Sequence, residues 1–206
     1  LDPFSLEDLL KAHGTMMHGL VEGVGELRTS SVGVINAQGK VIHVAPPHDM
    51  VKELMEQLFD WMKTSKTQML IRSSIFHYEF EFIHPFADGN GRTGRLWQTA
   101  LLASWKPIFE WIPIENIIKD NQDEYYRAIG LSTAEGKSNR FILFMLKVIQ
   151  KAVSELARDT RGHQNHITSQ IKALMSVVQS YPMTAAELME KLGLKSRASF
   201  RKNYLQ

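Results

Sequence analysis

The residues from His84 to Arg95, with the sequence HPFADGNGRTGR, gather several kinds of side chain that act on phosphates. The imidazole of His84 can accept or donate a proton near neutral pH. The carboxylate of Asp88 can hold a hard cation such as Mg²⁺. A proton acceptor close to a cation site is suited to the transfer of a phosphate-bearing group.

Glycines and arginines complete the segment. Gly89 and Gly91 flank Asn90 in a turn that lets backbone N–H groups approach an anion closely. Arg92 and Arg95 lie three residues apart on the helix expected next, and their guanidinium groups match phosphate oxygens. The segment therefore predicts an anion site at a helix N-terminus.

Each of these residues has a simpler interpretation when it is taken alone. A histidine before a proline often only ends a helix, and Asp-Gly-Asn-Gly is typical of a solvated turn. Two arginines at positions i and i+3 are typical of a solvated helix face. Their occurrence together favours the phosphate site, whereas Phe86 is best interpreted as a core residue that anchors the loop.

The same string resembles the signature of the Fic (Fido) family, H-P-F-x-[D/E]-G-N-G-R-x-x-R, and matches it at every fixed position. Residues 41–47 and 54–61 look like the segments that precede this signature, so the resemblance covers roughly residues 5–152. It implies a mainly α-helical fold: a Fic-type helical domain with a β-hairpin flap, followed by a small helix-turn-helix or winged-helix module.

The resemblance also implies an activity. It indicates a protein nucleotidylyltransferase that moves AMP from ATP to a Ser, Thr or Tyr hydroxyl of a target protein. His84 would be the general base, and Asp88 would hold Mg²⁺ against the phosphates of ATP. Gly89, Asn90 and Gly91 would shape the anion hole, with Asn90 orienting the phosphates.

Further roles follow from the same resemblance. Arg92 would hold the β-phosphate and Arg95 the γ-phosphate. Tyr125 and Tyr126 stand where the family forms part of its adenine pocket, but core aromatic residues are an equally good interpretation. The alternatives are another donor nucleotide, removal of AMP from a target, and a nucleotide-sensing DNA-binding regulator. An intact His84 argues against the last of these, because a protein that only senses nucleotide has no need for it.

A β-hairpin is predicted between Arg28 and Val44, where Val32, Val34, Ile42 and Val44 alternate on either side of a turn at 36–39. The plain interpretation is a surface hairpin without a role. The resemblance makes it a flap that binds the target by pairing with its extended backbone. Val32, Val34 and Ile42 are the residues assigned to this docking.

Helices are predicted after Ser5, over 48–62, 92–105, 122–131 and 139–156, with an apolar connector at 107–113. Residues 70–83 fit both a strand and a helix, and the resemblance favours the helix. Within 92–105, the spacing predicts a buried face of Leu96, Thr99, Ala100 and Ala103. His13, His18 and His77 are interpreted as structural residues.

The predicted domain limits are 1–157 for the Fic domain, 158–166 for a polar linker and 167–206 for an incomplete winged-helix-like module. Ser196–Lys202 would be its recognition helix. Contacts with protein, dimerisation or DNA binding are all open for it, with DNA the lesser candidate.

The composition is that of a globular protein, with 44% hydrophobic and 22% charged residues in a chain of 206. A net charge of +2 argues against nucleic acid or a membrane as main partner. The lack of cysteine excludes thiol chemistry and favours a cytoplasmic location. Because the first residue is Leu1, we expect a processed or truncated piece.

An inhibitory helix of the form [S/T]-x-x-x-E-[G/N] restrains many members of the family by pairing its Glu with the second arginine of the motif, here Arg95. Glu precedes Gly or Asn only at Glu22, Glu115 and Glu135, and none of these has Ser or Thr four residues earlier. We therefore expect an inhibitory segment to lie upstream of this chain or in a partner.

Overall fold

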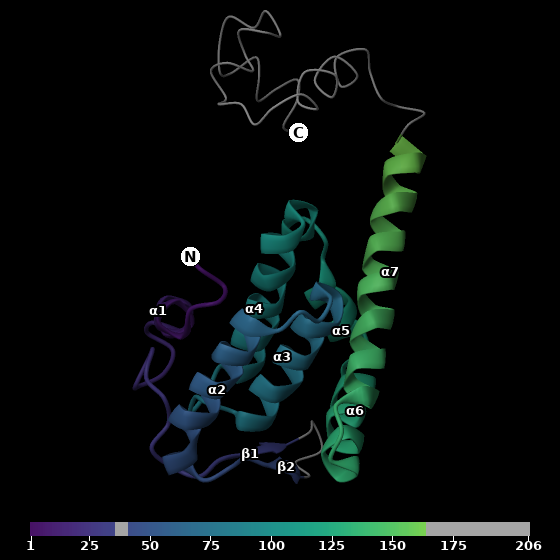
Figure 1. Ribbon diagram of the computed structural model, residues 1–206. Coiled ribbons are helices and arrows are strands. Elements are labelled where there is room, and N and C mark those ends of the chain that lie inside the picture. The colour runs from purple at the N-terminus through teal and green to yellow at the C-terminus, as the bar shows by residue number, and fades with distance from the viewer. Residues whose placement is uncertain (36–40, 164–206) are drawn as a thin grey trace, which may run out of the picture. The chain divides into compact units, whose positions relative to one another are not determined.

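The structure is a computed structural model that describes residues 1–35 and 41–163 (Figure 1). The chain divides into two compact units, Leu1–Ser154 and Glu155–Gln206. The first unit contains the hairpin and the helices up to the first part of the last one. The winged-helix-like module predicted for 167–206 lies outside the described residues, so the predicted domain limits remain predictions.

Helix α1 spans Leu6–Met17 and begins where the sequence predicts, because the hydroxyl of Ser5 accepts a hydrogen bond from the backbone N–H of Asp8 at 3.2 Å. The second predicted helix starts as the short 3-10 helix His48–Met50 and continues as α2, Val51–Thr64. Both predictions are confirmed.

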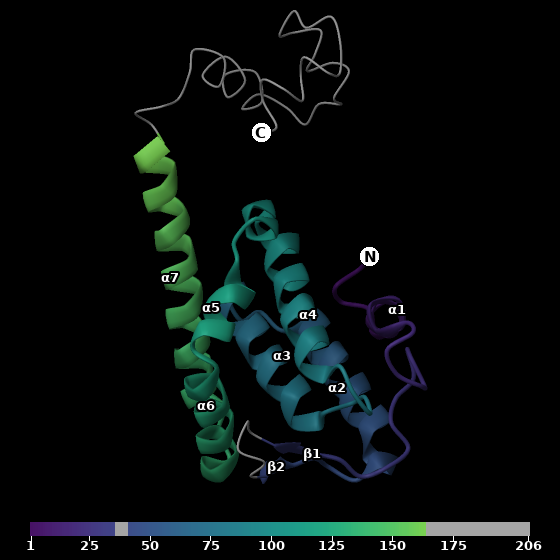
Figure 2. The same ribbon diagram turned by 180° about the vertical axis from the view of Figure 1, so that it is seen from behind.

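Helices α3 (Met69–Ile83) and α4 (Asn90–Trp105) pack against each other at the centre of the first unit. Helix α2 covers α3, and α1 contacts α4 (Figures 1 and 2). The helical interpretation of the ambiguous segment at 70–83 is therefore confirmed. Large aromatic side chains fill the core between these helices, namely Phe59, Phe76, Phe80, Phe86 and Trp97.

The buried face predicted for α4 is wrong by one residue. Leu96 is 44% exposed, whereas Trp97 is fully buried. The indole N–H of Trp97 donates to the carbonyl of Pro3 at 2.9 Å, and its ring meets Phe59 edge to face. Burying this largest side chain sets the rotation of the helix, so that the residues facing the core are Thr93, Gly94, Trp97, Gln98, Leu101 and Leu102.

The segment after α4 contains an element that the sequence analysis missed. A 3-10 helix at Pro107–Glu110 is followed by the short helix α5, Ile114–Asp120, whose isoleucines are buried. The predicted helices follow as α6, Gln122–Glu135, and α7, Asn139–His163. Because α7 continues to His163, the first residues of the predicted linker are helical.

The predicted hairpin is confirmed. Strand β1 (Gly33–Ile35) pairs antiparallel with β2 (Val41–Val44), and Val34 lies opposite His43. The imidazole Nε2–H of the buried His43 donates to the carbonyl of Phe82 at 2.6 Å, which fastens the hairpin to α3. Within the described ranges, no helix is both long and apolar enough to cross a bilayer.

Candidate active site

Residues 84–89 of the motif form the turn between α3 and α4, and residues 90–95 begin α4. His84 ends α3 in the left-handed conformation, with φ 51° and ψ 62°. Among the described residues, it alone has a positive φ without being glycine. This conformation costs on the order of 1 kcal/mol and persists only where surrounding contacts hold it.

Arg28 supplies those contacts. Its buried guanidinium donates to the backbone carbonyls of His84 at 2.8 Å and Ile83 at 3.2 Å. It also donates to the carbonyls of Ser30 at 2.7 Å and Pro46 at 2.6 Å. One cation thus ties the end of α3 to both flanks of the hairpin, a role that the sequence analysis did not find.

The His84 imidazole is set up to act as a base. Its Nδ1 lies 3.4 Å from the carbonyl oxygen of Glu81, which can only accept, so Nδ1 carries the proton and Nε2 keeps a free lone pair. Burial lowers the pKa of His84 to about 4, although the contact with the Glu81 carbonyl opposes this shift. The neutral ring that a general base requires therefore prevails at neutral pH.

Two side chains hold the loop after His84 in shape. Phe86 is fully buried and stacks on the ring of His13, with centroids 3.6 Å apart and an angle of 3°. The backbone N–H of Gly25 donates to Nδ1 of His13 at 2.9 Å, so the ring proton is on Nε2. The Nε2–H of His13 then donates to the carbonyl of Asp88 at 3.0 Å. The predicted anchoring role of Phe86 is confirmed, and His13 is structural as predicted, but it packs on the motif.

The side chain of Asn90 bonds to the loop. Its buried side chain accepts from the N–H of Phe86 and donates to the carbonyl of Phe86, both at 2.8 Å. Both polar ends of the amide are therefore engaged in bracing the loop. The structure therefore assigns the Asn90 side chain to holding the loop, and its expected part in orienting phosphates stays a prediction.

The N-terminus of α4 is open to an anion. Gly89 precedes the helix with φ 84°, and a side chain there would collide with Met17, whose sulfur would lie 2.7 Å from the added carbon. The first turn has neither a side-chain cap nor an acidic residue. Its first N–H groups therefore have no partner within the helix and carry the positive end of its dipole.

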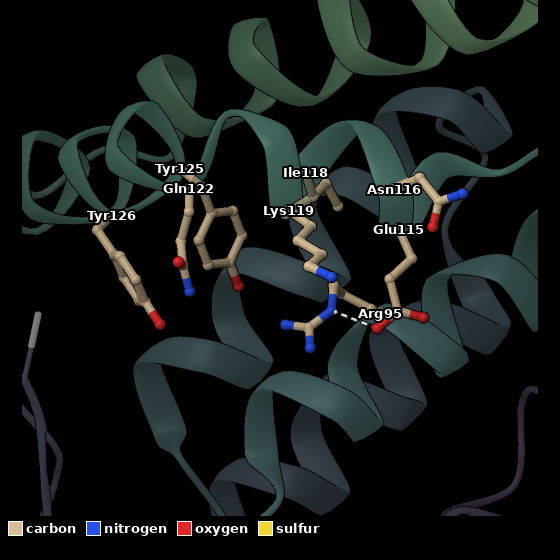
Figure 3. Close-up of a pocket in the computed structure, with 8 residues that line it drawn as sticks. All are labelled: Arg95, Glu115, Asn116, Ile118, Lys119, Gln122, Tyr125 and Tyr126. Carbon is tan, nitrogen blue, oxygen red and sulfur yellow. Dashed lines mark hydrogen bonds and ion pairs between the residues drawn. The ribbon is translucent and has the colours of Figure 1, made fainter. Parts of the chain in front are cut away.

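The two arginines of the motif each face a carboxylate. Nη2 of Arg92 lies 3.7 Å from Oδ2 of Asp88, and Nε of Arg95 donates to Oε1 of Glu115 at 3.1 Å (Figure 3). Glu115 lies on the missed helix α5, and the inhibitory pattern does not select it because Trp111 stands where Ser or Thr is required.

A cleft of about 390 Å³ opens over the motif and is bordered by Gly33 of the hairpin. A second hollow of about 290 Å³ between α4, α5 and α6 shares residues with it, among them Arg95 and Tyr126 (Figure 3). The cleft brings together the predicted site residues His84, Asp88, Gly89, Asn90, Gly91, Arg92, Arg95, Tyr125 and Tyr126.

The two tyrosines differ in what they can offer to a ligand. Tyr125 is only 3% exposed, and its ring belongs to an aromatic group with Phe141 and Phe144. Its hydroxyl lies 3.1 Å from Nε2 of His77. Tyr126 is half-buried, which leaves part of its ring free to border a base. Tyr125 is thus a core aromatic, and Tyr126 is the better candidate for stacking.

The hairpin borders the cleft through Gly33, where a flap is expected. Val32 is half-buried and its carbonyl accepts from Ala45 at 3.2 Å. The side chains of Val34 and Ile42 lie outside the described part of the chain. Among the described residues the sheet has only two strands, so each strand has an edge without a ladder partner.

The site offers one carboxylate to a cation, which suits a cation that takes most of its ligands from water and from the substrate. Across residues 1–35 and 41–163, no three His, Cys, Asp or Glu side chains gather to hold a metal ion. Asp88 is 61% exposed at the side of the loop, and its Oδ1 accepts from the N–H of Gly89 at 2.5 Å. One carboxylate fits Mg²⁺, which commonly takes its remaining ligands from phosphates and water.

Comparison with known proteins agrees with this geometry. Residues 3–102 match the Fic/DOC family. Residues 169–206 match a second family, the C-terminal domain of Fic-like proteins, which are described as filamentation induced by cAMP proteins. The chain belongs to the Fic/DOC family. The Fic domain of this chain contains α1–α4, the hairpin and the motif.

Named relatives of the Fic domain are adenylyltransferases. Protein adenylyltransferase fic-1 of Caenorhabditis elegans is 25% identical over 204 residues, which are 96% of this chain and 36% of that protein. Protein adenylyltransferase Fic of Drosophila willistoni is 30% identical over 156 residues, 72% of this chain and 28% of that protein. The chain thus spans about a third of the length of these curated relatives.

A solved structure extends the likeness over the whole chain. The crystal structure of a Fic family protein from Desulfovibrio desulfuricans G20 is 43% identical, with a TM-score of 0.75, and the match covers 100% of this chain and 62% of that one. Fic-1 of C. elegans shares the fold at 23% identity and a TM-score of 0.55, over 75% of this chain and 44% of that one.

Proposed function

We propose that this Fic protein transfers AMP from ATP to a hydroxyl group of a target protein. The observation that carries the proposal is the neutral His84 imidazole placed beside the open N-terminus of α4 and its two arginines. The family match and the names of the relatives support the same activity.

The reaction follows from what these groups can do. Nε2 of His84 takes the proton of the target hydroxyl, whose oxygen forms a bond to the α-phosphorus of ATP. The bond from that phosphorus to the bridging oxygen breaks, and pyrophosphate leaves. The N–H groups of α4 and the guanidinium groups of Arg92 and Arg95 stabilise the negative charge on the phosphates.

Mg²⁺ is the proposed cofactor. Held by Asp88 and phosphate oxygens, it would offset charge on the nucleotide. The target would lie along the hairpin, whose edge can pair with an extended segment that presents its hydroxyl to His84. The half-buried ring of Tyr126 would border the base.

The test uses the 206-residue chain, a cell lysate, and ATP, GTP, UTP and CTP, each labelled at the α-phosphate. We expect the label of ATP on a lysate protein or on the chain itself, with the mass of AMP on a Ser, Thr or Tyr by mass spectrometry. Label from another nucleotide would show that ATP is not the donor. Release of AMP from a previously modified protein would show that the reaction is removal of AMP. If the His84→Asn variant still attaches the label, His84 is not the base.

A further inference from the structure

Glu81 is a buried carboxyl group that the proposed chemistry leaves unused. It lies on α3 one turn before His84 and is 3% exposed. Its Oε1 atom has no hydrogen-bond partner within the described part of the chain. A buried polar oxygen without a partner is costly, so its retention calls for a reason other than stability.

The carboxyl faces the base on one side and the second arginine of the motif on the other. Oε2 of Glu81 lies 3.9 Å from Nδ1 of His84. The guanidinium of Arg95 is close enough for its charge to lower the pKa of Glu81. The same carboxyl also borders the cleft over the motif.

Helix α4 leaves space for this group through a glycine. A Cβ atom added to Gly94 would lie 2.9 Å from Oε1 of Glu81 and 3.1 Å from the ring of Phe80. Position 94 is not specified in the family signature, yet a side chain there would displace the carboxyl. Helix α4 can therefore pack this closely against Glu81 only with a glycine at position 94.

His77 and Tyr125 are the other polar neighbours of the carboxyl. Nδ1–H of His77 donates to Oε1 of Gln98, and Nε2 of His77 lies 3.1 Å from the hydroxyl of Tyr125. Oε1 of Glu81 lies 3.9 Å from that same Nε2, beyond hydrogen-bond distance. The Tyr125 hydroxyl lies close enough to the Glu81 carboxyl to lower its pKa.

We propose that Glu81 is a positioning residue of the active site, whose carboxyl orients the imidazole of His84 and the guanidinium of Arg95 relative to each other. Its effect on catalysis rests on the proposed function of His84. Its effect on the two side chains does not, and is measurable in the resting protein.

Electrostatics supports the assignment. Burial raises the pKa of Glu81 to about 7, while the Arg95 charge and the nearby Tyr125 hydroxyl oppose this rise. The titratable and charged groups around it are His77 and His84 of α3, Arg95 of α4 and Tyr125 of α6. When Glu81 ionises, its charge favours a proton on His84 and so makes the imidazole a stronger base.

The first experiment follows the ring nitrogens of His84 by NMR in protein labelled with ¹⁵N-histidine, with the signals assigned from the His84→Asn spectrum. In the wild-type chain we expect these signals to move near pH 7, where Glu81 ionises. In Glu81→Gln this step should vanish. The matched control is Glu79→Gln, because Glu79 lies on the same helix, has its pKa raised by burial, and borders the groove between α2 and α3 instead.

The second experiment separates positioning from folding. Glu81→Met keeps a similar volume and removes the unpaired oxygen, so its melting temperature should equal or exceed that of the wild type. With transfer as the readout, kcat should fall about tenfold in Glu81→Gln and Glu81→Met, and the rise of kcat near pH 7 should be lost.

The outcomes are distinct. If Glu81→Gln and Glu79→Gln give the same His84 titration as the wild type, the proposal is overturned. A large loss of melting temperature in Glu81→Met with unchanged kcat would also overturn it, since Glu81 would then be structural. If the chain transfers no nucleotide, the proposed function falls while the NMR result still decides whether Glu81 is coupled to His84.

Discussion

Nε of Arg95 donates to Oε1 of Glu115 at 3.1 Å, so the arginine proposed to hold the γ-phosphate is paired with a carboxylate of its own chain. Glu115 comes from α5, twenty residues further along the chain. An arginine cannot give the same donors to a carboxylate and to a phosphate, so the two compete.

We predict that Glu115→Gln binds ATP more tightly. The Glu115 side chain is exposed, and exposed ion pairs contribute up to about 1 kcal/mol, which corresponds to at most about a fivefold decrease in Kd. Isothermal calorimetry with ATP and Mg²⁺ measures this change. Glu110→Gln, an exposed change outside both hollows, is the control, and weaker binding in Glu115→Gln would mean that Glu115 assists the nucleotide.

Replacement of His84 should remove catalysis but not nucleotide binding. We expect His84→Asn to lower the rate of transfer by about 10²–10⁴. Asn tolerates the left-handed conformation of this position better than Ala, so the fold should be kept. The comparison of kcat with the Kd for ATP checks the prediction, with His18→Asn on the exposed end of α1 as control. A near-normal kcat would mean that another group takes the proton.

Removal of the charge of Asp88 should affect only metal-dependent binding. Asp88→Asn keeps an oxygen that can accept from the N–H of Gly89 and so preserves the turn. We expect weaker ATP binding with Mg²⁺ present and unchanged binding in EDTA. An equal loss under both conditions would assign Asp88 to loop structure.

Arg28→Lys should destabilise the protein. A lysine cannot reproduce the fork that reaches four backbone carbonyls, and the loss of charged hydrogen bonds at a buried site costs about 3 kcal/mol. Urea unfolding measures the free energy. Arg140→Lys, at an exposed ion pair with Glu135, should change it by less than about 1 kcal/mol. Equal effects of the two changes would contradict the clamping role of Arg28.

The stability of the protein should depend on pH in opposite ways for its buried histidines and for Glu81. Burial lowers the pKa of His13, and lowers those of His77 and His84 to about 4. Their contribution is complete above the unfolded value of about 6.5 and is lost as the pH falls toward 4. The raised pKa of Glu81 acts oppositely, since its contribution is lost as the pH rises from about 4.5 toward 7.

Because three histidines oppose one carboxyl, we expect the free energy of unfolding to rise between pH 4 and 6.5. Each group contributes a slope of up to about 1.4 kcal/mol per pH unit. Glu81→Met should steepen the rise, since it removes the opposing group. Urea unfolding at several pH values is the measurement, and a flat profile would show that these histidines have ordinary pKa values in the fold.

The site chemistry was predictable from the sequence where it is local. Residues 84–89 form the turn between α3 and α4, and residues 90–95 begin α4, so His84, Asp88 and Arg92 border the same cleft wherever that turn forms. The helical spacing likewise predicted α1, α2, α4, α6 and most of α7, whereas the family resemblance decided for a helix at α3. The alternation of valines predicted the hairpin. These features depend on neighbours a few residues away, which a sequence shows directly.

The remaining features depend on contacts between distant parts of the chain. The bond from Arg28 to His84 spans 56 residues, and that from His13 to Asp88 spans 75. No local spacing predicts such pairs, because they arise when whole helices pack. The same holds for the bond from Arg95 to Glu115 and for the burial of Tyr125. It also holds for the buried face of α4, which is set by the burial of the large Trp97 side chain and not by the spacing of the smaller residues.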